Sequence, residues 1–189
     1  MISNFITETI ISIDQYTNIL LYSLRHPLAI KIFNIITLLG ESWTIIIFVL
    51  ITSITLYTAN KKWQIIGLWL TVGGSVGFTF LAKIFFDRPR PISALIIETS
   101  PSFPSAHAAV AISFYGFILY LLFKKMNKKR DQILVALFGL ILIALIGFSR
   151  LYLGVHYLSD VLIGYLVGLL WLIIGTKLNN YSPPLLKKN

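Results

Sequence analysis

Two kinds of residue are scarce in this chain, and each scarcity excludes a class of protein. The 189 residues include no cysteine, which excludes a disulfide framework, a thiolate nucleophile and a cysteine-based metal site. Charged residues make up only 12% of the chain, whereas 57% of the residues are hydrophobic and the mean hydropathy is +0.82. A water-soluble domain of this size would expose too much of that apolar surface. The composition therefore predicts a protein whose solvent is a lipid bilayer.

Acidic residues are fewer than basic ones, with 7 Asp and Glu against 16 Lys and Arg, which gives a net charge of +9. In a water-soluble protein such an excess indicates nucleic-acid binding. Here the basic residues gather in short runs between apolar segments, which is the pattern of the positive-inside rule. We therefore expect the bilayer and a membrane lipid as partners, and no nucleic acid.

Five apolar stretches are predicted to span the membrane, since about 20 apolar residues cross a hydrocarbon core. Four are strongly apolar, at residues 64–86, 107–123, 133–148 and 157–177, and the fifth, at residues 43–59, is shorter but carries no charge. Charged residues and Pro27 interrupt the apolar residues of segment 1–40. We therefore interpret this segment as amphipathic helices that lie in the membrane interface. A sixth span over residues 5–24 is the alternative.

The fold class predicted from this pattern is all-α, a polytopic membrane helical bundle in one domain. It comprises an interfacial segment (residues 1–40), the bundle (43–177) and a cytoplasmic tail (178–189). Lys-rich loops at 60–62, 124–130 and 187–188 belong in the cytoplasm. Five alternating spans then place the loops at 87–106 and 149–156 together on the extracytoplasmic face of the plasma membrane.

Gly73-x3-Gly77 and Gly164-x3-Gly168 predict close helix packing.

A first polar cluster ends the span at 64–86 and contains Lys83, Arg88 and Arg90, with a proline after each arginine. Ionisable side chains at the end of an apolar span are costly unless they reach water or a partner. The prolines stop the helix and hold the two guanidiniums on a stiff loop. Lys83 alone is explained as a snorkelling anchor, but the arginines favour an anion-binding site.

A second cluster, Ser102-Phe-Pro104-Ser105-Ala106-His107, comes directly before an apolar helix. Pro and Ser are typical of a first helical turn. The first N–H groups of a helix have no internal partner, and the helix dipole favours an anion there. A phosphate at this position would accept bonds from these N–H groups and from the Ser105 hydroxyl, with His107 beside it. An ordinary serine cap is the alternative interpretation.

A third cluster contains Ser149, Arg150, His156 and Asp160. His156 and Asp160 are four residues apart, so on a helix they share one face. A carboxylate against one ring nitrogen fixes the tautomer and leaves the other nitrogen as a base or nucleophile. A His–Asp pair that only holds helices together is the alternative.

Together the three clusters supply the groups that phosphoryl transfer requires. Fixed cations balance the charge of the phosphoryl oxygens, a nucleophile attacks in line, and an acid protonates the leaving oxygen. No cluster of metal ligands matches a two-metal site. The sequence therefore favours a reaction without cofactor or metal, through a phosphohistidine.

The spacing of these residues resembles the three-part signature of the type 2 phosphatidic acid phosphatase superfamily, which includes membrane lipid phosphate phosphatases and soluble vanadium haloperoxidases. The match covers residues 83–160, with order and spacing kept: Lys83-x6-Arg90-Pro91, Pro104-Ser105-Ala106-His107 and Ser149-Arg150-x5-His156-x3-Asp160.

The resemblance implies a role for each matched residue. His156 is the nucleophile, Asp160 orients it, and His107 protonates the leaving group. The phosphoryl oxygens would be held by Lys83, Arg90, Ser105 and Arg150. Ala106 departs from the pattern, because the family usually has glycine there; its methyl group narrows the approach of phosphate to the backbone.

The resemblance further implies hydrolysis of a lipid phosphate or pyrophosphate. Substrates of bacterial relatives include undecaprenyl pyrophosphate, phosphatidylglycerol phosphate, diacylglycerol pyrophosphate and phosphatidic acid. The alternative is a non-catalytic membrane protein that binds or transports a lipid phosphate. The apolar spans argue against a haloperoxidase.

Overall fold

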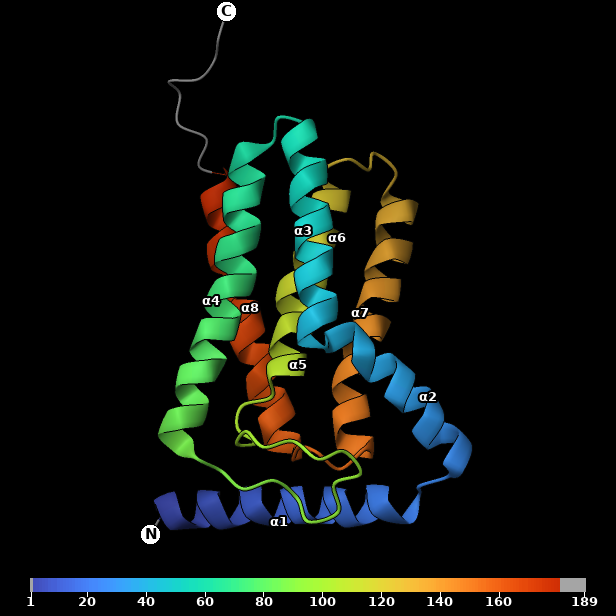
Figure 1. The fold of residues 1–189 in the computed structure, drawn as a ribbon, viewed down its shortest axis with the longest axis vertical. Helices are drawn as coiled ribbons and strands as arrows, with labels where there is room; N and C mark the ends of the chain where they lie inside the picture. Colours follow the sequence, from blue (N-terminus) through green and yellow to red (C-terminus); the bar gives the residue numbers. More distant parts are fainter. Residues whose placement is uncertain (1, 181–189) are drawn as a thin grey trace, which may run out of the picture.

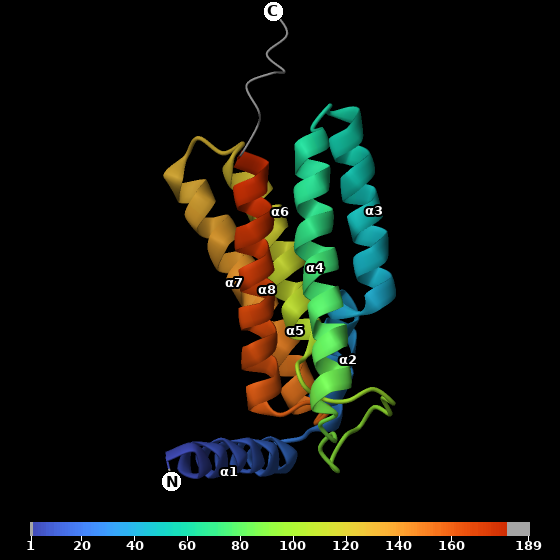
Figure 2. The same cartoon turned by 90° about the vertical axis from the view of Figure 1, so that its left-hand side faces the viewer.

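The computed structural model describes residues 2–180, and within this range the chain forms helices and no strand. In chain order the elements are α1 (Ile2–Ser23), α2 (Pro27–Thr37), the 3₁₀ turn η1 (Leu38–Gly40), α3 (Ser42–Thr58), α4 (Lys62–Phe86), α5 (Ala106–Val110), the π turn η2 (Ala111–Tyr115), α6 (Gly116–Phe123), α7 (Lys129–Tyr152) and α8 (Leu158–Asn180). Helices α3 to α8 run roughly side by side as a bundle, whereas α1 lies across one end of it (Figures 1 and 2).

Four helical stretches are long and apolar enough to cross a membrane: Lys62–Phe86, Ala106–Phe123, Lys129–Tyr152 and Leu158–Leu178. The second of these is α5, η2 and α6 in one continuous run. A fifth candidate is a bent pair, in which α2 with η1 meets α3 at an angle of 46°. The predicted all-α membrane bundle is confirmed. Most of the predicted tail, residues 178–189, lies outside the described residues, as does the pair Lys187-Lys188.

The first 40 residues divide into two parts with different positions. Helix α1 ends at Ser23, and Pro27 occupies the first turn of α2, where its missing N–H leaves no bond unmade. Helix α1 lies across the bundle end, as an interfacial helix does. Helix α2, in contrast, rises toward α3 and packs on α7, with the ring of Phe33 centred 4.7 Å from that of Tyr152. The predicted interfacial segment therefore describes α1, while α2 belongs to the bundle because its aromatic face has a partner there.

Helix α1 turns Asp14, Asn18 and Leu21 toward the protein and most of its large apolar side chains away from it. Among residues 7–23, only Asp14 and Leu21 are buried. Asn18, on the same face, accepts a hydrogen bond of 2.8 Å from the Ser93 hydroxyl. The outward side chains include Ile13, Tyr16, Ile19 and Tyr22, all exposed. This distribution suits a helix that lies between the loops of the bundle and the lipid.

The loops separate into two groups at opposite ends of the bundle (Figure 1). Residues 59–61 and 124–128, which carry or adjoin the Lys-rich runs, lie at one end. Residues 87–105 and 153–157 lie at the other, together with α1. This is the grouping that five alternating spans predict, and it brings the three polar clusters to one end.

The two glycine pairs have different surroundings. A Cβ on Gly164 would lie 2.5 Å from the carbonyl oxygen of Ser105, and one on Gly168 would lie 2.3 Å from that of Ala109. Helix α8 therefore approaches the backbone of α5 closely, as predicted. The corresponding prediction for Gly73 and Gly77 is wrong, since a Cβ on either would meet nothing within 4 Å.

Gly168→Ala should destabilise the protein by about 1–3 kcal/mol, because the added methyl group must push α8 away from α5. Gly77→Ala is the matched control, since its methyl group meets open space and alanine favours a helix by about 1 kcal/mol over glycine. Thermal unfolding of both variants in one detergent provides the comparison. Equal midpoints would contradict the close contact of α5 and α8.

Candidate active site

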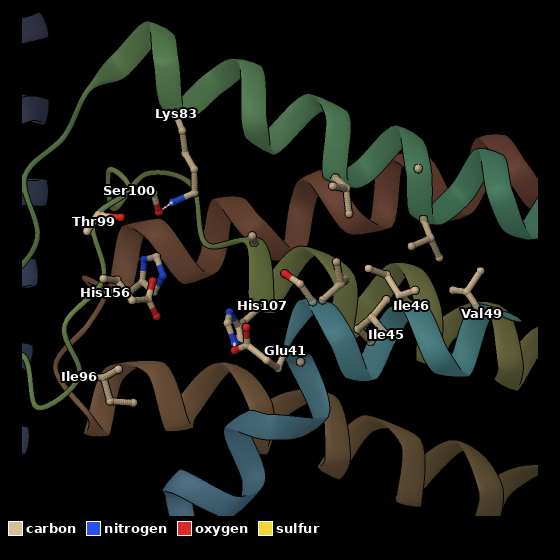
Figure 3. Close-up of a pocket in the computed structure, with 18 of the residues that line it drawn as sticks. Glu41, Ile45, Ile46, Val49, Lys83, Ile96, Thr99, Ser100, His107 and His156 are labelled. Carbon is tan, nitrogen blue, oxygen red and sulfur yellow. Dashed lines mark hydrogen bonds and ion pairs between the residues drawn. The ribbon is translucent and has the colours of Figure 1, made fainter. Parts of the chain in front are cut away.

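A cavity of about 700 Å³ lies between α3, α4 and the start of α5 (Figure 3). Its polar end is formed by side chains from all three sequence clusters. Of the residues that the sequence predicts for the site, five line the cavity: Lys83, Arg90, Ala106, His107 and His156. Residues far apart in the chain thus converge on one space large enough for a phosphorylated head group.

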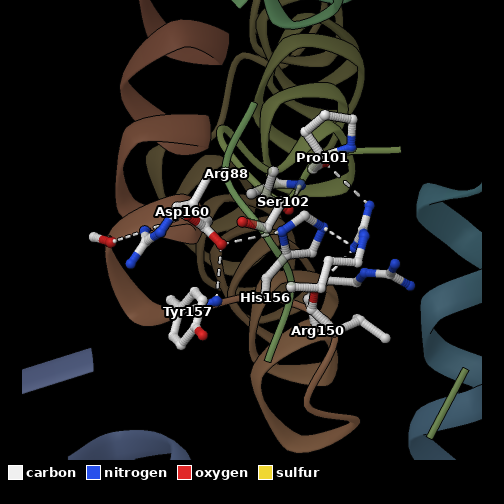
Figure 4. Close-up of polar contacts among 12 residues, drawn as sticks. Arg88, Pro101, Ser102, Arg150, His156, Tyr157 and Asp160 are labelled. Carbon is white, nitrogen blue, oxygen red and sulfur yellow. Dashed lines mark hydrogen bonds and ion pairs between the residues drawn. The ribbon is translucent and has the colours of Figure 1, made fainter. Parts of the chain in front are cut away.

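His156 and Asp160 face each other at the start of α8 (Figure 4). His156 Nδ1 lies 3.5 Å from Asp160 Oδ2, which is long for a hydrogen bond. On the other side of the ring, Nε2 lies 3.3 Å from Nη1 of Arg90. A guanidinium has donors only, so Nε2 must be the acceptor and the ring proton must be on Nδ1. In this tautomer Nδ1–H faces the carboxylate and Nε2 keeps a lone pair.

The surroundings of His156 also keep its imidazole neutral. Burial is the largest cause, and it lowers the pKa of His156 to about 4, with the charges of Arg150 and Arg90 acting in the same direction. The Asp160 carboxylate acts in the opposite direction. A neutral imidazole is the form that can act as a nucleophile near pH 7.

Asp160 is fully buried and accepts hydrogen bonds from several segments. Its Oδ1 accepts from Nη1 of Arg88 at 2.6 Å, and its Oδ2 accepts from the backbone N–H of Tyr157 at 2.9 Å. Its main-chain carbonyl accepts from the N–H of Ser105 at 3.0 Å. The bonds from Arg88 and Tyr157 compensate the buried charge and fix the direction of the carboxylate, whereas the bond from Ser105 joins the start of α8 to the start of α5.

Three cations lie around the polar end of the cavity. Lys83 donates to the Ser100 hydroxyl at 3.4 Å, and Nε of Arg90 donates to the Ser100 carbonyl at 2.8 Å. Arg150 donates from Nη1 to the Thr37 hydroxyl at 2.7 Å. Its Nε is buried and has no hydrogen-bond partner in the described part of the chain. Arg150 does not line the cavity itself, but it reaches the cavity through a glutamate.

That glutamate is Glu98, whose carboxylate lies between Arg90 and Arg150. One oxygen is 2.6 Å from Nη2 of Arg90, and the other forms a short ion pair with Nη2 of Arg150. Burial acts to raise the pKa of Glu98, but the two guanidiniums outweigh it, so this pKa is lower than usual. The ionised carboxylate of Glu98 therefore lies between two guanidiniums, a position in which the oxygens of a phosphate could bind instead.

His107 has a carboxylate partner of its own, since its Nε2 lies 3.2 Å from Oε2 of Glu41. Glu41 stands at the corner between η1 and α3. At the same corner, a Cβ on Gly40 would come within 2.9 Å of the His107 ring. The bend between η1 and α3 thus places Gly40 against the His107 ring and the Glu41 carboxylate at Nε2. This acceptor keeps a proton on Nε2.

The remaining predicted residues lie at the start of α5. Ser105 is fully buried and is not among the residues that line the cavity. Its hydroxyl accepts from the N–H of Ala108 at 3.5 Å, so it caps the helix. Ala106 lines the cavity, and its methyl group fills space that a glycine would leave open.

Arg88, which the sequence predicts for anion binding together with Arg90, instead pairs with Asp14 and Asp160. The sequence motifs do not include Asp14, Glu41 or Glu98. The scarcity of acidic residues could have pointed to these three acids, because the chain has only 7 Asp and Glu. In a bilayer protein a carboxylate away from water requires a partner, and these three, of which Asp14 is buried and the other two partly buried, lie beside a cation or a histidine.

A model of the PAP2 superfamily matches residues 63–183. The chain belongs to the PAP2 superfamily. Phosphatidylglycerophosphatase B of Bacillus subtilis (strain 168) is 31% identical over 167 residues, which are 87% of this chain and 82% of that protein. Lipid phosphate phosphatase delta of Arabidopsis thaliana is 31% identical over 84 residues, which are 41% of this chain and 20% of that protein.

Two solved structures share the PAP2 fold of this chain. The crystal structure of a transmembrane PAP2-type phosphatidylglycerolphosphate phosphatase from Bacillus subtilis has a TM-score of 0.86 and 28% identity, and the match covers 93% of this chain and 89% of that one. Aquifex aeolicus LpxE has a TM-score of 0.71 and 25% identity, over 87% of this chain and 94% of that one. The resemblance that the three motifs predict is confirmed.

The imidazole of His156 should titrate near pH 4 in the isolated protein, because burial and two guanidiniums disfavour its charged form. The unfolded chain takes up this proton near pH 6.5, so the group removes stability as the pH falls from about 6.5 toward 4. NMR of ¹³C-labelled histidine measures the titration, and His156→Gln identifies the signal among the 3 histidines. Titration of His156 above about pH 6 would contradict the buried position.

Proposed function

We propose that this PAP2 protein is a lipid phosphate phosphatase that hydrolyses a phosphomonoester or pyrophosphate bond of a membrane lipid. The observation that carries the proposal is the two-part lining of the cavity. One end holds cations and two histidines. The rest is lined by apolar side chains of α3 and α4: Ile45, Ile46, Val49, Trp69, Val72 and Val76. This arrangement suits a phosphorylated head group attached to a hydrocarbon chain.

The cavity is open toward the side of the bundle. Helices α3 and α4 meet at residues 59–61 and diverge toward the end where α1 lies (Figure 1). Ile46 and Trp69 line the cavity and are 47% and 50% exposed. Gly73 lies on the same wall and adds no side chain to it. In our proposal the lipid enters sideways through this opening, while its chain stays in the bilayer.

The first chemical step is attack of His156 Nε2 on phosphorus, for which the ring has the required tautomer and a lone pair. Lys83, Arg90 and Arg150 neutralise the phosphoryl oxygens, after the phosphate has displaced Glu98 from the two guanidiniums. The bond from phosphorus to the leaving oxygen breaks, and His107 gives that oxygen a proton. The product is a phosphohistidine whose positive ring faces Asp160.

The second step returns the enzyme to its starting state. A water molecule attacks phosphorus, and His107 takes the proton of that water. The N–P bond breaks, its electron pair returns to Nε2, and inorganic phosphate leaves. No metal ion takes part in this proposal, because the three cations supply the positive charge. Glu41 keeps His107 in a position to exchange its proton.

The names of the relatives support a lipid substrate. They concern phosphatidylglycerophosphate in two cases and lipid phosphate in a third. Undecaprenyl pyrophosphate, diacylglycerol pyrophosphate and phosphatidic acid are further candidates of the same chemistry. A binding or transport protein for lipid phosphates is the alternative, but binding requires only the cations and not two histidines, each with its own carboxylate.

His156→Ala should lower phosphate release by about 1,000-fold or more, because it removes the nucleophile. Asp160→Asn should lower it by about 100-fold or more, because the ring loses the charge that orients it. Release from a panel of the four candidate lipids, in excess chelator, measures both effects. His26→Ala is the histidine control, since His26 lies outside the cavity.

A folded His156→Ala protein with substantial activity would contradict the phosphohistidine route. Loss of wild-type activity in chelator, restored by Mg²⁺, would contradict the metal-free step. Absence of release from every lipid by wild-type protein would favour the binding alternative.

We further propose that the site opens at the extracytoplasmic face, because the Lys-rich loops lie at the other end of the bundle. Ile92 and Asn127 are exposed at the two ends, and the chain has no native cysteine. Ile92→Cys should react with a membrane-impermeant thiol reagent in intact cells, whereas Asn127→Cys should react only after permeabilisation. The opposite labelling pattern would place the site in the cytoplasm.

A further inference from the structure

Asp14 is a buried acid that the proposed reaction does not use. It belongs to α1, a helix whose other side chains are mostly exposed, and only 2% of its surface is accessible. A carboxylate is rarely buried without a strong reason, because removing its charge from water is costly. The reason here is a set of three donors at the catalytic end of the bundle.

Two of these donors belong to Ser159, the residue before Asp160, and the third to Arg88. Asp14 Oδ1 accepts from the Ser159 N–H at 2.9 Å, and Oδ2 accepts from the Ser159 hydroxyl at 2.6 Å and from Arg88 Nη2 at 2.8 Å. The other end of the same guanidinium, Nη1, donates to Asp160 at 2.6 Å. The ring of Tyr157 lies below the guanidinium, 4.2 Å from ring centroid to carbon. One arginine therefore connects Asp14 to the partner of His156.

The charges of this cluster explain why two acids flank one arginine. Arg88 and Asp160 alone form a neutral pair, in which the arginine cancels the charge that His156 meets. Asp14 adds a second negative charge to the same guanidinium. The three side chains together then carry one negative charge, the same as a lone aspartate. Arg88 can thus fix the direction of the Asp160 carboxylate while the cluster stays anionic.

The proposed reaction depends on that anionic charge. When Nε2 bonds to phosphorus, the ring of His156 becomes positive. The groups that face this ring or line its cavity include three acids: Asp160 on α8, Glu98 in the loop and Glu41 before α3. The other charged or titratable groups there are Lys83 (α4), Arg90 (loop), Arg150 (α7) and His107 (α5). Glu98 pairs with two guanidiniums and Glu41 pairs with His107, so Asp160 is the acid left to stabilise the positive ring.

We propose that Asp14 is a positioning residue for the reaction: it neutralises Arg88, so that Arg88 orients Asp160 without weakening the attraction between Asp160 and the positive ring of His156. The inference rests on the proposed function, because it assigns Asp14 to the nucleophile of that reaction. It also gives the interfacial helix α1 a direct connection to the chemistry.

The kinetic test uses Asp14→Asn, which keeps the shape and removes the charge. With dioctanoyl phosphatidic acid in mixed micelles, kcat should fall by about tenfold or more, the effect of one charged hydrogen bond. KM should change little, because the cations that bind phosphate are untouched. The double variant Asp14→Asn with Arg88→Gln should be more active than Asp14→Asn alone, since no arginine then cancels the charge of Asp160. A merely structural role would make the double variant as impaired or worse.

Asn18→Ala is the matched control on the same face of α1. It removes the contact of α1 with Ser93 but changes no charge, so kcat should stay close to that of the wild type. Full activity of Asp14→Asn, or a double variant no better than Asp14→Asn, would overturn the proposal.

A second readout does not depend on catalysis. By NMR, the imidazole of His156 should take up its proton at a lower pH in Asp14→Asn than in the wild type. Arg88→Gln alone should shift this titration to higher pH, and it serves as the test if Asp14→Asn does not fold. Absence of both shifts would overturn the inference. If the wild type releases no phosphate while both shifts occur, the proposed function fails and the charge coupling stands.

Discussion

The carboxylate of Asp160 is fully buried at the start of a membrane-spanning helix, where a charge is stable only if donors surround it. The donors come from segments that are far apart in the chain. Arg88 binds the carboxylate from the loop after α4, and Ser105 binds its main-chain carbonyl from the start of α5. Because Ser105 also caps the helix that carries His107, a hydrogen bond joins the aspartate that faces His156 to the start of the helix that carries the other histidine. Residues of all three sequence motifs thus meet at Asp160: Arg88 and the Tyr157 N–H at its carboxylate, and Ser105 at its main-chain carbonyl.

A second constraint is the bend between η1 and α3. It brings Glu41 to His107 and Gly40 against the ring of that histidine. It also starts α3 partway along the bundle (Figure 1). The apolar walls of α3 and α4 therefore begin directly beyond the polar end of the cavity. The bend between η1 and α3 thus gives the proposed acid, His107, its carboxylate partner. It also marks the point where the lining of the cavity changes from polar to apolar.

The sequence predicted the spans, the family and the convergence of Lys83, Arg90, His107 and His156, because these follow from local patterns of hydropathy and spacing. It could not predict the roles of Arg88, Asp14, Glu41 and Glu98. The three acids are single charged residues with no local pattern, and Arg88 belongs to a motif that does not reveal its acidic partners. These partners are defined only by the packing of helices. The packing of α2 could not be predicted for a similar reason: α2 resembles an interfacial helix in composition, and its contact with α7 is visible only in the structure. The prediction of close helix packing at Gly73 and Gly77 is wrong because the spacing of glycines does not reveal whether a neighbouring helix is present.

The contacts of Asp14 also determine when the site can form during synthesis. Its partners Arg88 and Ser159 are 74 and 145 residues later in the chain. Helix α1 is therefore synthesised first, but its contacts with Ser159 can form only after α8 has been made. Contacts of such long range close only when most of the chain is ordered. A chain that stops before α8 lacks Asp160 and Ser159, so the carboxylate of Asp14 can find Arg88 as a donor but not the hydroxyl and N–H of Ser159.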